Sequence, residues 1–463
     1  MRNKTVCICC ALIITFFCFT ENIVLAIESP PEKQYIVKFN DQIALFRSES
    51  DERLNILSEN ELQECIDAGI VEWYEEDYIV ELLEESQTET EESQYDKWDL
   101  NIIESNSAIE IGCYGQEVKI AVIDSGIVEH EDLVGNIQEG YNYLSNTTDV
   151  IDNIGHGTFV SGLIAAEMNE YGIVGVAPKA EIIPLKCFDT GTTTTVSVIK
   201  KAIEDAVDKY DVDIINMSFG LTQYSQTLEN AINHAIDNGV IVVAAVGNKG
   251  TETLYYPAAF ENVIGVGSID SNCDKSDFSQ FNQSVDVVAP GENVYSTTNT
   301  NGYGSKNGTS FSTPIVTGTI AFMMNVNANI DLEYIMTVLC ATSVDKGETG
   351  YDIFYGNGII NIKNIKEYML KGVGYFISPI DVTDEGSSVV VYNNTDNVLE
   401  ATFFMNNYRK DALMDFENTD LKIESNKCLK IPSAYYKNKI KCYIWKNISD
   451  IKVLGMFRER EVN

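Results

Sequence analysis

Apolar runs alternate with segments of helical spacing through the middle of the chain. Five runs carry apolar residues too densely for a half-exposed strand, at 118–124, 180–188, 212–220, 240–248 and 263–270. Because they lack strict polar and apolar alternation, they are predicted to be buried strands. Between them, 196–210 and 228–238 have the apolar spacing of amphipathic helices. This repetition predicts an α/β fold: a mostly parallel sheet with helices on both faces, whose ligand sites lie beyond the carboxyl ends of its strands.

Two further regions flank this segment. Residues 34–83 combine a strand-like run at 35–39, a helical middle at 59–68 and a second strand-like run that ends at Leu83, which predicts a small α+β unit. After Gly372 the pattern changes to short alternating strands, which predicts a small all-β domain. Examples of these short strands are 387–392, 400–405 and 441–445.

A polar segment separates the first unit from the α/β region. From Glu84 to Gln94 the chain contains only Glu, Ser, Thr and Gln, the composition of a solvated linker. Composition fits a plain spacer and a processed junction equally well.

The N-terminus has the pattern of an export signal. Arg2 and Lys4 precede a 14-residue apolar run, 6–19, and Val24-Leu25-Ala26 offers a cleavage position after Ala26. A membrane anchor is the weaker alternative, because a spanning helix needs about 20 apolar residues. We therefore expect a secreted, extracellular protein without stable membrane insertion after signal removal.

Charge and cysteine content narrow the function classes. The 70 acidic and 32 basic residues give a formal net charge of -38, which disfavours binding to nucleic acid. Of 11 cysteines, those outside the signal lack the spacing of a zinc module. Only Cys428 and Cys442 share one strand-rich region, and a disulfide between them is a hypothesis that spacing cannot prove.

Two segments place a carboxylate and an imidazole where a site is expected. Asp124 ends a buried strand and is followed by the turn glycine Gly126. His156 lies between Gly155 and Gly157, just before a predicted helix at 159–167, and glycines there let another backbone come close. Taken alone, an Asp at a strand end is usually a cap or a turn residue.

A third segment adds a hydroxyl. In the run Asn307-Gly308-Thr309-Ser310, a glycine turn leads to a serine at a helix start, where free backbone N–H groups can stabilise an oxyanion. A carboxylate, an imidazole and a hydroxyl together are the groups that nucleophilic acyl transfer needs.

The three segments, with Pro314 four residues after Ser310, resemble the signature segments of the subtilisin-like serine protease family (subtilases, peptidase S8) in their order Asp, His, Ser. The similarity runs roughly from Trp98 to Leu370. It implies a serine endopeptidase that needs no catalytic cofactor. In it, Ser310 is the nucleophile, His156 is the general base and acid, and Asp124 orients the imidazole. Asn248, after a buried strand, matches the side-chain donor of the oxyanion hole.

The resemblance also implies substrate contacts. Ser218, Phe219 and Gly220 are similar to the edge strand that pairs with an extended peptide substrate. Tyr255 lies in a segment that resembles the wall of the primary specificity pocket, at a position where the family often has glycine. We expect Tyr255 to narrow this pocket, which favours small or medium apolar side chains, unless the ring points away and packs elsewhere.

A structural calcium site is implied in the same way. The spacing from His156 onwards matches the family's calcium loop, and Asp132 falls near an aspartate ligand of the family. Asp132 and Asn169 would bind calcium through their side chains. Glu167, Tyr171 and Ile173 would bind through their backbone carbonyls.

The leading unit resembles the family's inhibitory prodomain, which would act as an intramolecular inhibitor until it is cut near Leu83 or within the linker. The expected organisation is signal peptide 1–26, prodomain 27–83, acidic linker 84–95, catalytic domain 96–370 and C-terminal β-rich domain 371–463. We expect a monomer acting on peptide or protein substrates. Two alternatives remain: a dedicated processing protease for exported peptides, and an inactive relative that binds through the C-terminal domain.

Overall fold

The structure is a computed structural model, and it divides the chain into two compact units, one ending at Glu76 and the other beginning at Asp77. The described residues are 33–39, 55–83, 87–88, 97–169, 171–373, 375–383, 386–409, 412–433, 438–445 and 458–462. The predicted export signal lies outside them, as does most of the acidic linker.

The first unit is a three-stranded antiparallel sheet with one helix. Its elements are β1 (Gln34–Phe39), β2 (Asn55–Ser58), α2 (Glu59–Asp67) and β3 (Val71–Glu76), with β1 in the centre of the sheet. Helix α2 begins with a capping box, in which the Glu61 carboxylate accepts from the Ser58 N–H at 2.9 Å. A small α+β unit is present as predicted, but it ends at Glu76, because the run that was expected to close it at Leu83 forms β4 (Ile79–Leu82), which pairs with strands of the second unit.

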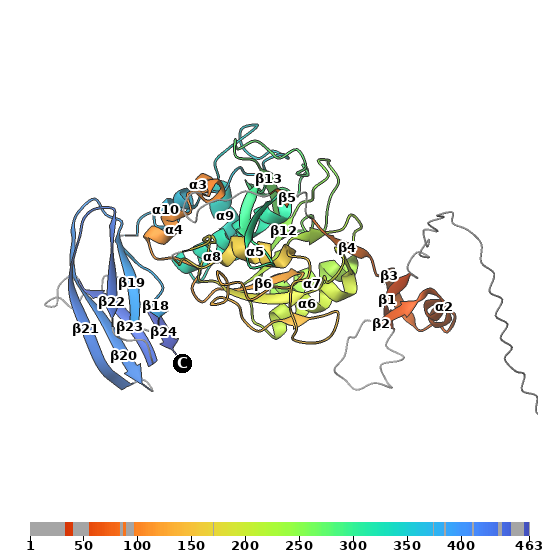
Figure 1. Ribbon diagram of the computed structural model, residues 1–463, viewed down its shortest axis with the longest axis horizontal. Helices are drawn as coiled ribbons and strands as arrows, with labels where there is room; N and C mark the ends of the chain where they lie inside the picture. Colours follow the sequence, from red (N-terminus) through yellow and green to blue (C-terminus); the bar gives the residue numbers. More distant parts are fainter. Residues whose placement is uncertain are drawn as a thin grey trace, which may run out of the picture. The chain divides into compact units, whose positions relative to one another are not determined.

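A seven-stranded sheet forms the centre of the second unit (Figure 1). Its order is β14-β13-β12-β10-β6-β8-β7, and all its strand pairs are parallel. The strands are β6 (Lys119–Asp124), β7 (Tyr141–Asn142), β8 (Glu181–Lys186), β10 (Ile214–Met217), β12 (Ile241–Ala245), β13 (Ile264–Ile269) and β14 (Val287–Pro290). β10, β12 and β13 are buried along their whole length, as the dense apolar runs predicted, and so is β14, which was not predicted as a separate strand.

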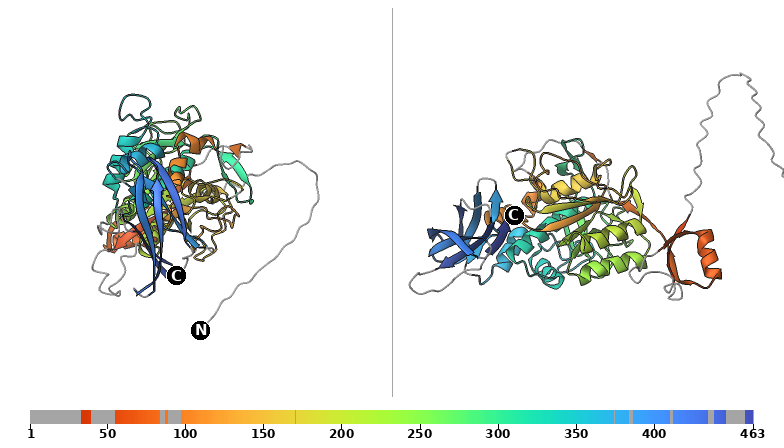
Figure 2. Two further views of the ribbon diagram at one scale, coloured as in Figure 1. Left: turned by 90° about the vertical axis from the view of Figure 1, so that its left-hand side faces the viewer. Right: turned by 90° about the horizontal axis from the view of Figure 1, so that it is seen from below.

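Helices cover both faces of this sheet, with α5 on one side and α6 and α7 on the other (Figure 2). The main helices are α5 (His156–Ala165), α6 (Val196–Asp208), α7 (Gln226–Asp237), α8 (Thr309–Val326) and α9 (Leu332–Thr342). Shorter helices are α3 (Trp98–Ile102), α4 (Asn106–Glu110) and α10 (Ile362–Met369). The predicted fold class is therefore confirmed. No helix among the described residues is long and apolar enough to cross a membrane.

Small antiparallel sheets lie outside the central one. One has the order β11-β4-β9 and the other β15-β16-β5. Their strands are β4 (Ile79–Leu82), β5 (Gln87–Thr88), β9 (Thr193–Thr195), β11 (Phe219–Gly220), β15 (Val294–Thr297) and β16 (Tyr303–Lys306). The predicted single strand at 212–220 is thus two strands, because the chain leaves the central sheet at Ser218 and β11 pairs with β4 instead of with β12.

The C-terminal region folds into two antiparallel sheets, as predicted. The first contains β17 (Tyr375–Ile377), β18 (Asp381–Thr383), β19 (Gly386–Asn393) and β22 (Lys427–Ser433). The second contains β20 (Leu399–Arg409), β21 (Ala412–Ile423), β23 (Asn438–Trp445) and β24 (Arg458–Val462). The proposed disulfide is wrong: both thiols are free, with Cys428 exposed on β22 and Cys442 buried in the core of these sheets.

Candidate active site

The carboxylate and the imidazole predicted from the sequence meet at the carboxyl end of the central sheet. Asp124 is the last residue of β6, and His156 is the first residue of α5. His156 Nδ1 lies 2.8 and 2.9 Å from the two carboxylate oxygens of Asp124, and both side chains are fully buried. His156 Nε2 has no hydrogen-bond partner among the described residues, which leaves this nitrogen available for a proton. The arrangement is that of an oriented general base.

Glycines allow this close approach. A Cβ on Gly157 would lie 2.2 Å from the carbonyl oxygen of Gly126, and Gly155 has a φ of +87°. Side chains at these positions would push the α5 terminus away from the strand end, which explains the glycines on both sides of His156.

Asp152 links the segment that follows Asp124 to the start of the helix that carries His156. Its Oδ1 accepts from the Ser125 hydroxyl at 2.7 Å and from the N–H groups of Ile154 and Gly155. Its Oδ2 accepts from both the N–H and the hydroxyl of Thr158, at 2.9 and 2.7 Å. Asp152 therefore fixes the turn after Asp124 relative to the first turn of α5.

Ser310 lies in the first turn of α8, as predicted, and it touches a peptide carbonyl. Its hydroxyl donates to the carbonyl oxygen of Leu83 and to that of Ser218, the latter at 2.9 Å. Asn248 Nδ2 donates to the same Leu83 oxygen at 2.7 Å. The side-chain oxygen of Asn248, Oδ1, accepts from the Thr309 N–H and hydroxyl, which holds the amide with its NH₂ toward Leu83.

The strand that leads to this carbonyl lies between two other strands. β4 pairs antiparallel with β11 on one side and with β9 on the other, and the Leu83 N–H donates to the Ser218 carbonyl at 3.3 Å. The Leu83 side chain is 5% exposed and forms an apolar cluster with Ala245 and Tyr255. Ser218, Phe219, Gly220 and Tyr255, the residues expected to contact a peptide substrate, thus all lie beside this segment.

Comparisons with known proteins agree with this geometry. A sequence profile of the subtilase family matches residues 115–358, more than half of the chain. The alkaline protease of Shouchella clausii is 35% identical over 329 residues, which cover 70% of this chain and 85% of that protein. Subtilisin Savinase of Lederbergia lenta is 38% identical over 264 residues, covering 57% and 96% respectively.

The chain belongs to the subtilase family. It is a subtilisin-like serine endopeptidase. Alkaline elastase YaB of Bacillus sp. (strain YaB), 33% identical over 369 residues, extends the match to 76% of this chain and 95% of that protein. The alternative of an inactive binding protein is therefore wrong.

The residues expected to bind calcium in this subtilase also come together. Asp132 is fully buried, and its oxygens accept from Asn169 Nδ2 at 2.7 Å and from the Ile173 N–H at 2.8 Å. Burial raises the pKa of Asp132, although these hydrogen bonds oppose the shift. The Glu167 N–H donates to the Asp132 carbonyl at 2.8 Å, and the Tyr171 N–H donates to Asn169 Oδ1 at 3.1 Å.

Sequence reasoning missed two residues of the site. Asp152 belongs to none of the motifs identified in the sequence. Lys186, buried on β8, was part of a run interpreted only as a strand, yet its ammonium donates to the carbonyls of Ser125 and Ile151 at 2.8 and 2.9 Å. A lysine inside a buried apolar run was the available signal, because such a charge needs partners.

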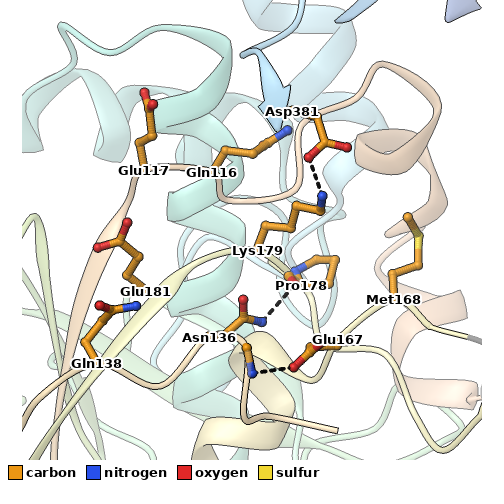
Figure 3. A pocket seen from close by; sticks show the side chains of 11 residues that line it. Gln116, Glu117, Asn136, Gln138, Glu167, Met168, Pro178, Lys179, Glu181 and Asp381 are labelled. Carbon is orange, nitrogen blue, oxygen red and sulfur yellow. Dashed lines mark hydrogen bonds and ion pairs between the residues drawn. The ribbon is translucent and has the colours of Figure 1, made fainter. Parts of the chain in front are cut away.

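A polar cavity of about 410 Å³ is lined in part by Glu167 of the expected calcium loop and by none of Asp124, His156, Asn248 and Ser310. Glu117, Glu167 and Glu181 line it, and an ion pair joins Lys179 to Asp381 of β18 at its rim (Figure 3). This ion pair connects the catalytic part of the second unit to the C-terminal sheets.

Proposed function

We propose that this subtilase hydrolyses peptide bonds through Ser310, His156 and Asp124, with Asn248 as oxyanion donor. The observation that carries the proposal is the Leu83 carbonyl, whose oxygen contacts both the Ser310 hydroxyl and Asn248 Nδ2. A carbonyl in this position is at once next to a nucleophile and next to a donor for the charge that develops on its oxygen.

Each group has a defined task. Ser310 Oγ attacks the carbonyl carbon while His156 Nε2 takes the hydroxyl proton, and the oxyanion is held by Asn248. His156 then returns the proton to the leaving amine as the C–N bond breaks, which leaves an acyl group on Ser310. Water, deprotonated by His156, releases the acid. Asp124 keeps the imidazole in the required tautomer and stabilises its cation.

The same contacts support a preference for aliphatic residues before the cleaved bond. The chain's own segment Val80-Glu81-Leu82-Leu83 lies as an extended strand with Val80, Leu82 and Leu83 buried. Leu83 fills the space between Ala245 and Tyr255. A peptide bound in this way presents a medium-sized side chain to the pocket that Tyr255 narrows.

We also propose that the enzyme is made as a zymogen that cuts itself after Leu83, with residues 27–83 as prodomain. The approach to Leu83 is anchored at the start of α6, where the Asp77 carboxylate accepts from the Ser197 N–H at 2.8 Å and from its hydroxyl at 2.7 Å. These contacts do not depend on the bond after Leu83, so the cut segment is expected to stay between β9 and β11 and to inhibit until it is degraded. Release outside the cell follows from the proposed signal cut after Ala26, and we expect the released enzyme to be a monomer.

Self-processing is tested by expressing the chain from residue 27 onwards, with and without Ser310→Ala. The wild-type chain is expected to yield a new N-terminus at Glu84, and the variant is expected to stay intact. Unchanged processing in the Ser310→Ala chain, or a first cut at another bond, would overturn the proposal.

Calcium is proposed as a structural ion in the loop around Asp132. The donors fit, because one buried carboxylate, one amide and backbone carbonyls of the same loop are the oxygen ligands that calcium takes. The loop lies so close to this carboxylate that only glycine fits at Gly172, where a Cβ would lie 2.4 Å from Asp132 Oδ2. Asp132, Asn169, Glu167, Tyr171 and Ile173 would hold the ion, which would offset the burial of the Asp132 charge.

Melting of the inactive Ser310→Ala chain tests the calcium proposal without self-digestion. A chelator is expected to lower the melting temperature, and the Asp132→Asn variant is expected to lose this response. Equal melting temperatures with calcium and with chelator, at constant ionic strength, would contradict the calcium proposal.

A further inference from the structure

The carbonyl oxygen of Ser310 lacks the usual helical donor. In an α-helix the carbonyl of one residue accepts from the N–H four residues later. Four residues after Ser310 stands Pro314, which has no N–H. Both residues are buried, and a buried carbonyl without a donor costs free energy. The Ser218 hydroxyl supplies the donor that Pro314 lacks, at 2.8 Å from the Ser310 carbonyl oxygen.

A second buried residue orients the Ser218 hydroxyl. Asn216 Nδ2 donates to Ser218 Oγ at 3.1 Å, which leaves the single hydroxyl proton of Ser218 for the Ser310 carbonyl. Asn216 is the one polar residue of β10, and its side chain is fully buried. An amide in the middle of an apolar strand costs free energy unless its groups are hydrogen-bonded. Its presence there indicates a task other than filling the core.

Thr317 completes a chain of hydrogen bonds. It lies on α8, about two helical turns after Ser310. Its hydroxyl donates to Asn216 Oδ1 at 2.9 Å, and because this bond uses the amide oxygen, it turns the Asn216 NH₂ toward Ser218. The donors therefore run in one direction, from the Thr317 hydroxyl to the Ser310 carbonyl. The residues of this hydrogen-bond chain are all fully buried, and they join α8 to β10 at two points.

The backbone of Ser218 also contacts the peptide that is to be cut. Its carbonyl oxygen accepts from the Leu83 N–H at 3.3 Å and from the Ser310 hydroxyl at 2.9 Å. One residue thus holds the peptide before the reacting carbonyl and, through its hydroxyl, the backbone of the nucleophile. A shift of Ser218 relative to α8 changes the distance between Ser310 Oγ and the reacting carbonyl carbon. A misplacement of about 1 Å can lower a rate about 100-fold.

We propose that Asn216 and Thr317 are positioning residues for the reaction. They act through Ser218, whose hydroxyl they orient toward the carbonyl that Pro314 leaves without its helical donor. The inference deepens the proposed function and rests on it, since it takes Ser310 as the nucleophile. Loss of either residue is expected to lower the rate of acyl transfer more than the affinity for the peptide, because peptide binding uses the backbone of Ser218.

Removal of the Thr317 hydroxyl tests the proposal. A quenched fluorescent peptide with the chain's own sequence Val-Glu-Leu-Leu-Glu-Glu is the substrate, and kcat is measured per active site titrated with a fluorophosphonate. Thr317→Val keeps the shape of the side chain. It is expected to lower kcat about tenfold and to change KM less than about twofold, as for the loss of one net hydrogen bond that acts in the transition state. Thr317→Ser, which restores the hydroxyl, should recover most of kcat.

The matched control lies on the same helix. Thr319 is equally buried, but its hydroxyl donates to the Ile315 carbonyl within α8 at 2.9 Å. Thr319→Val should therefore keep the wild-type kcat, which separates the hydrogen-bond chain from a general effect of valine on α8. An equal loss of kcat in both valine variants would overturn the proposal, as would a wild-type kcat in Thr317→Val.

A double variant tests whether Thr317 acts through Ser218. Ser218→Ala removes the last donor of the hydrogen-bond chain and should itself lower kcat about tenfold or more. Adding Thr317→Val should lower kcat no further, because the chain is already broken. Independent losses that multiply to about 100-fold would contradict the proposal. A wild-type enzyme without a titratable site would overturn the proposed function and this inference with it.

Discussion

Tyr255 should set the preference for the residue before the cleaved bond. Its ring lies between two glycines: a Cβ on Gly220 would be 3.0 Å from Tyr255 Cδ1, and one on Gly247 would be 2.9 Å from Cδ2. With Leu83 5% and Tyr255 7% exposed, little room is left for a larger side chain. A phenylalanine in place of leucine has to displace the ring, and overpacking of this kind costs about 1 to 3 kcal/mol.

The expected rates follow from these contacts. Wild-type enzyme should cleave after Leu about fivefold to 150-fold faster than after Phe, from the same 1 to 3 kcal/mol. Replacing Leu by Ala in the peptide removes three buried carbons, about 2.4 kcal/mol at 0.8 each, and lowers kcat/KM about 50-fold. Tyr255→Ala opens the pocket, so the preference should reverse in favour of Phe.

The assay is kcat/KM on three peptides that differ only in the residue before the cut, which is Ala, Leu or Phe. Tyr255→Phe is the matched control and should keep the wild-type order, because the ring and not the hydroxyl fills the space. Equal cleavage after Leu and Phe by the wild-type enzyme would refute the reasoning. So would an unchanged ratio in Tyr255→Ala, since the ring would then not border the pocket.

Three further predictions concern the site and its support. Asn248→Ala should lower kcat about 100-fold to 1000-fold with little change in KM, because it removes a donor that acts on the transition state. Asp152→Asn should lower kcat about tenfold or more and also the melting temperature, since one buried donor of Thr158 loses its acceptor. Asp286→Asn should stabilise the protein at pH 8 but not at pH 4, because burial raises the pKa of Asp286 to about 6.

The sign for Asp286 follows from proton binding. The folded-state pKa of Asp286 lies above its ordinary value. The Asp286 carboxyl group therefore makes its full contribution to the free energy of unfolding below about pH 4, and this contribution is lost as the pH rises to about 6. Above that, the buried carboxylate costs at most about 3 kcal/mol relative to low pH. Melting of the Ser310→Ala chain with and without Asp286→Asn measures this, and exposed Asp237→Asn is the control. An equal rise in the melting temperature of the Asp286→Asn variant at pH 4 and at pH 8 would contradict this prediction.

The other two predictions have separate controls. For Asn248, a change in KM alone would show that the amide binds substrate in the ground state and not the transition state. For Asp152, Asp152→Glu is informative: it keeps the carboxylate, so partial recovery of kcat at an unchanged KM separates positioning of His156 from a general loss of structure. An Asp152→Asn enzyme with wild-type kcat would rule out the positioning role.

Much of the fold could be predicted because its main signals are local. Buried parallel strands are dense apolar runs, and the glycines beside His156 mark places where backbones approach. What escaped prediction depends on partners distant in the chain. Asp152 accepts from Ser125, 27 residues away, and nothing in its own neighbourhood distinguishes it from an ordinary loop aspartate. Helix α5 begins at His156 itself and not after it, because the glycine turn ends one residue earlier.

The disulfide hypothesis failed for a similar reason. The number of residues between Cys428 and Cys442 does not determine on which face of its strand each side chain lies. In the structure the Cys428 thiol is exposed, whereas Cys442 lies in the core. The sequence likewise predicted only that the cut lies near Leu83 or within the linker. It could not place Leu83 at Ser310, because the register of β4 against β11 depends on residues far apart in the chain.

The central claim is that Ser310 is the nucleophile and that His156 activates it. Its most direct test is to treat the processed enzyme with a fluorophosphonate and to locate the adduct by peptide mass spectrometry. The account predicts a single phosphonylated residue, Ser310, and labelling that is at least 100-fold slower in the His156→Ala chain, in line with the loss of its general base. Adduct formation at another serine, or equally fast labelling without His156, would contradict it.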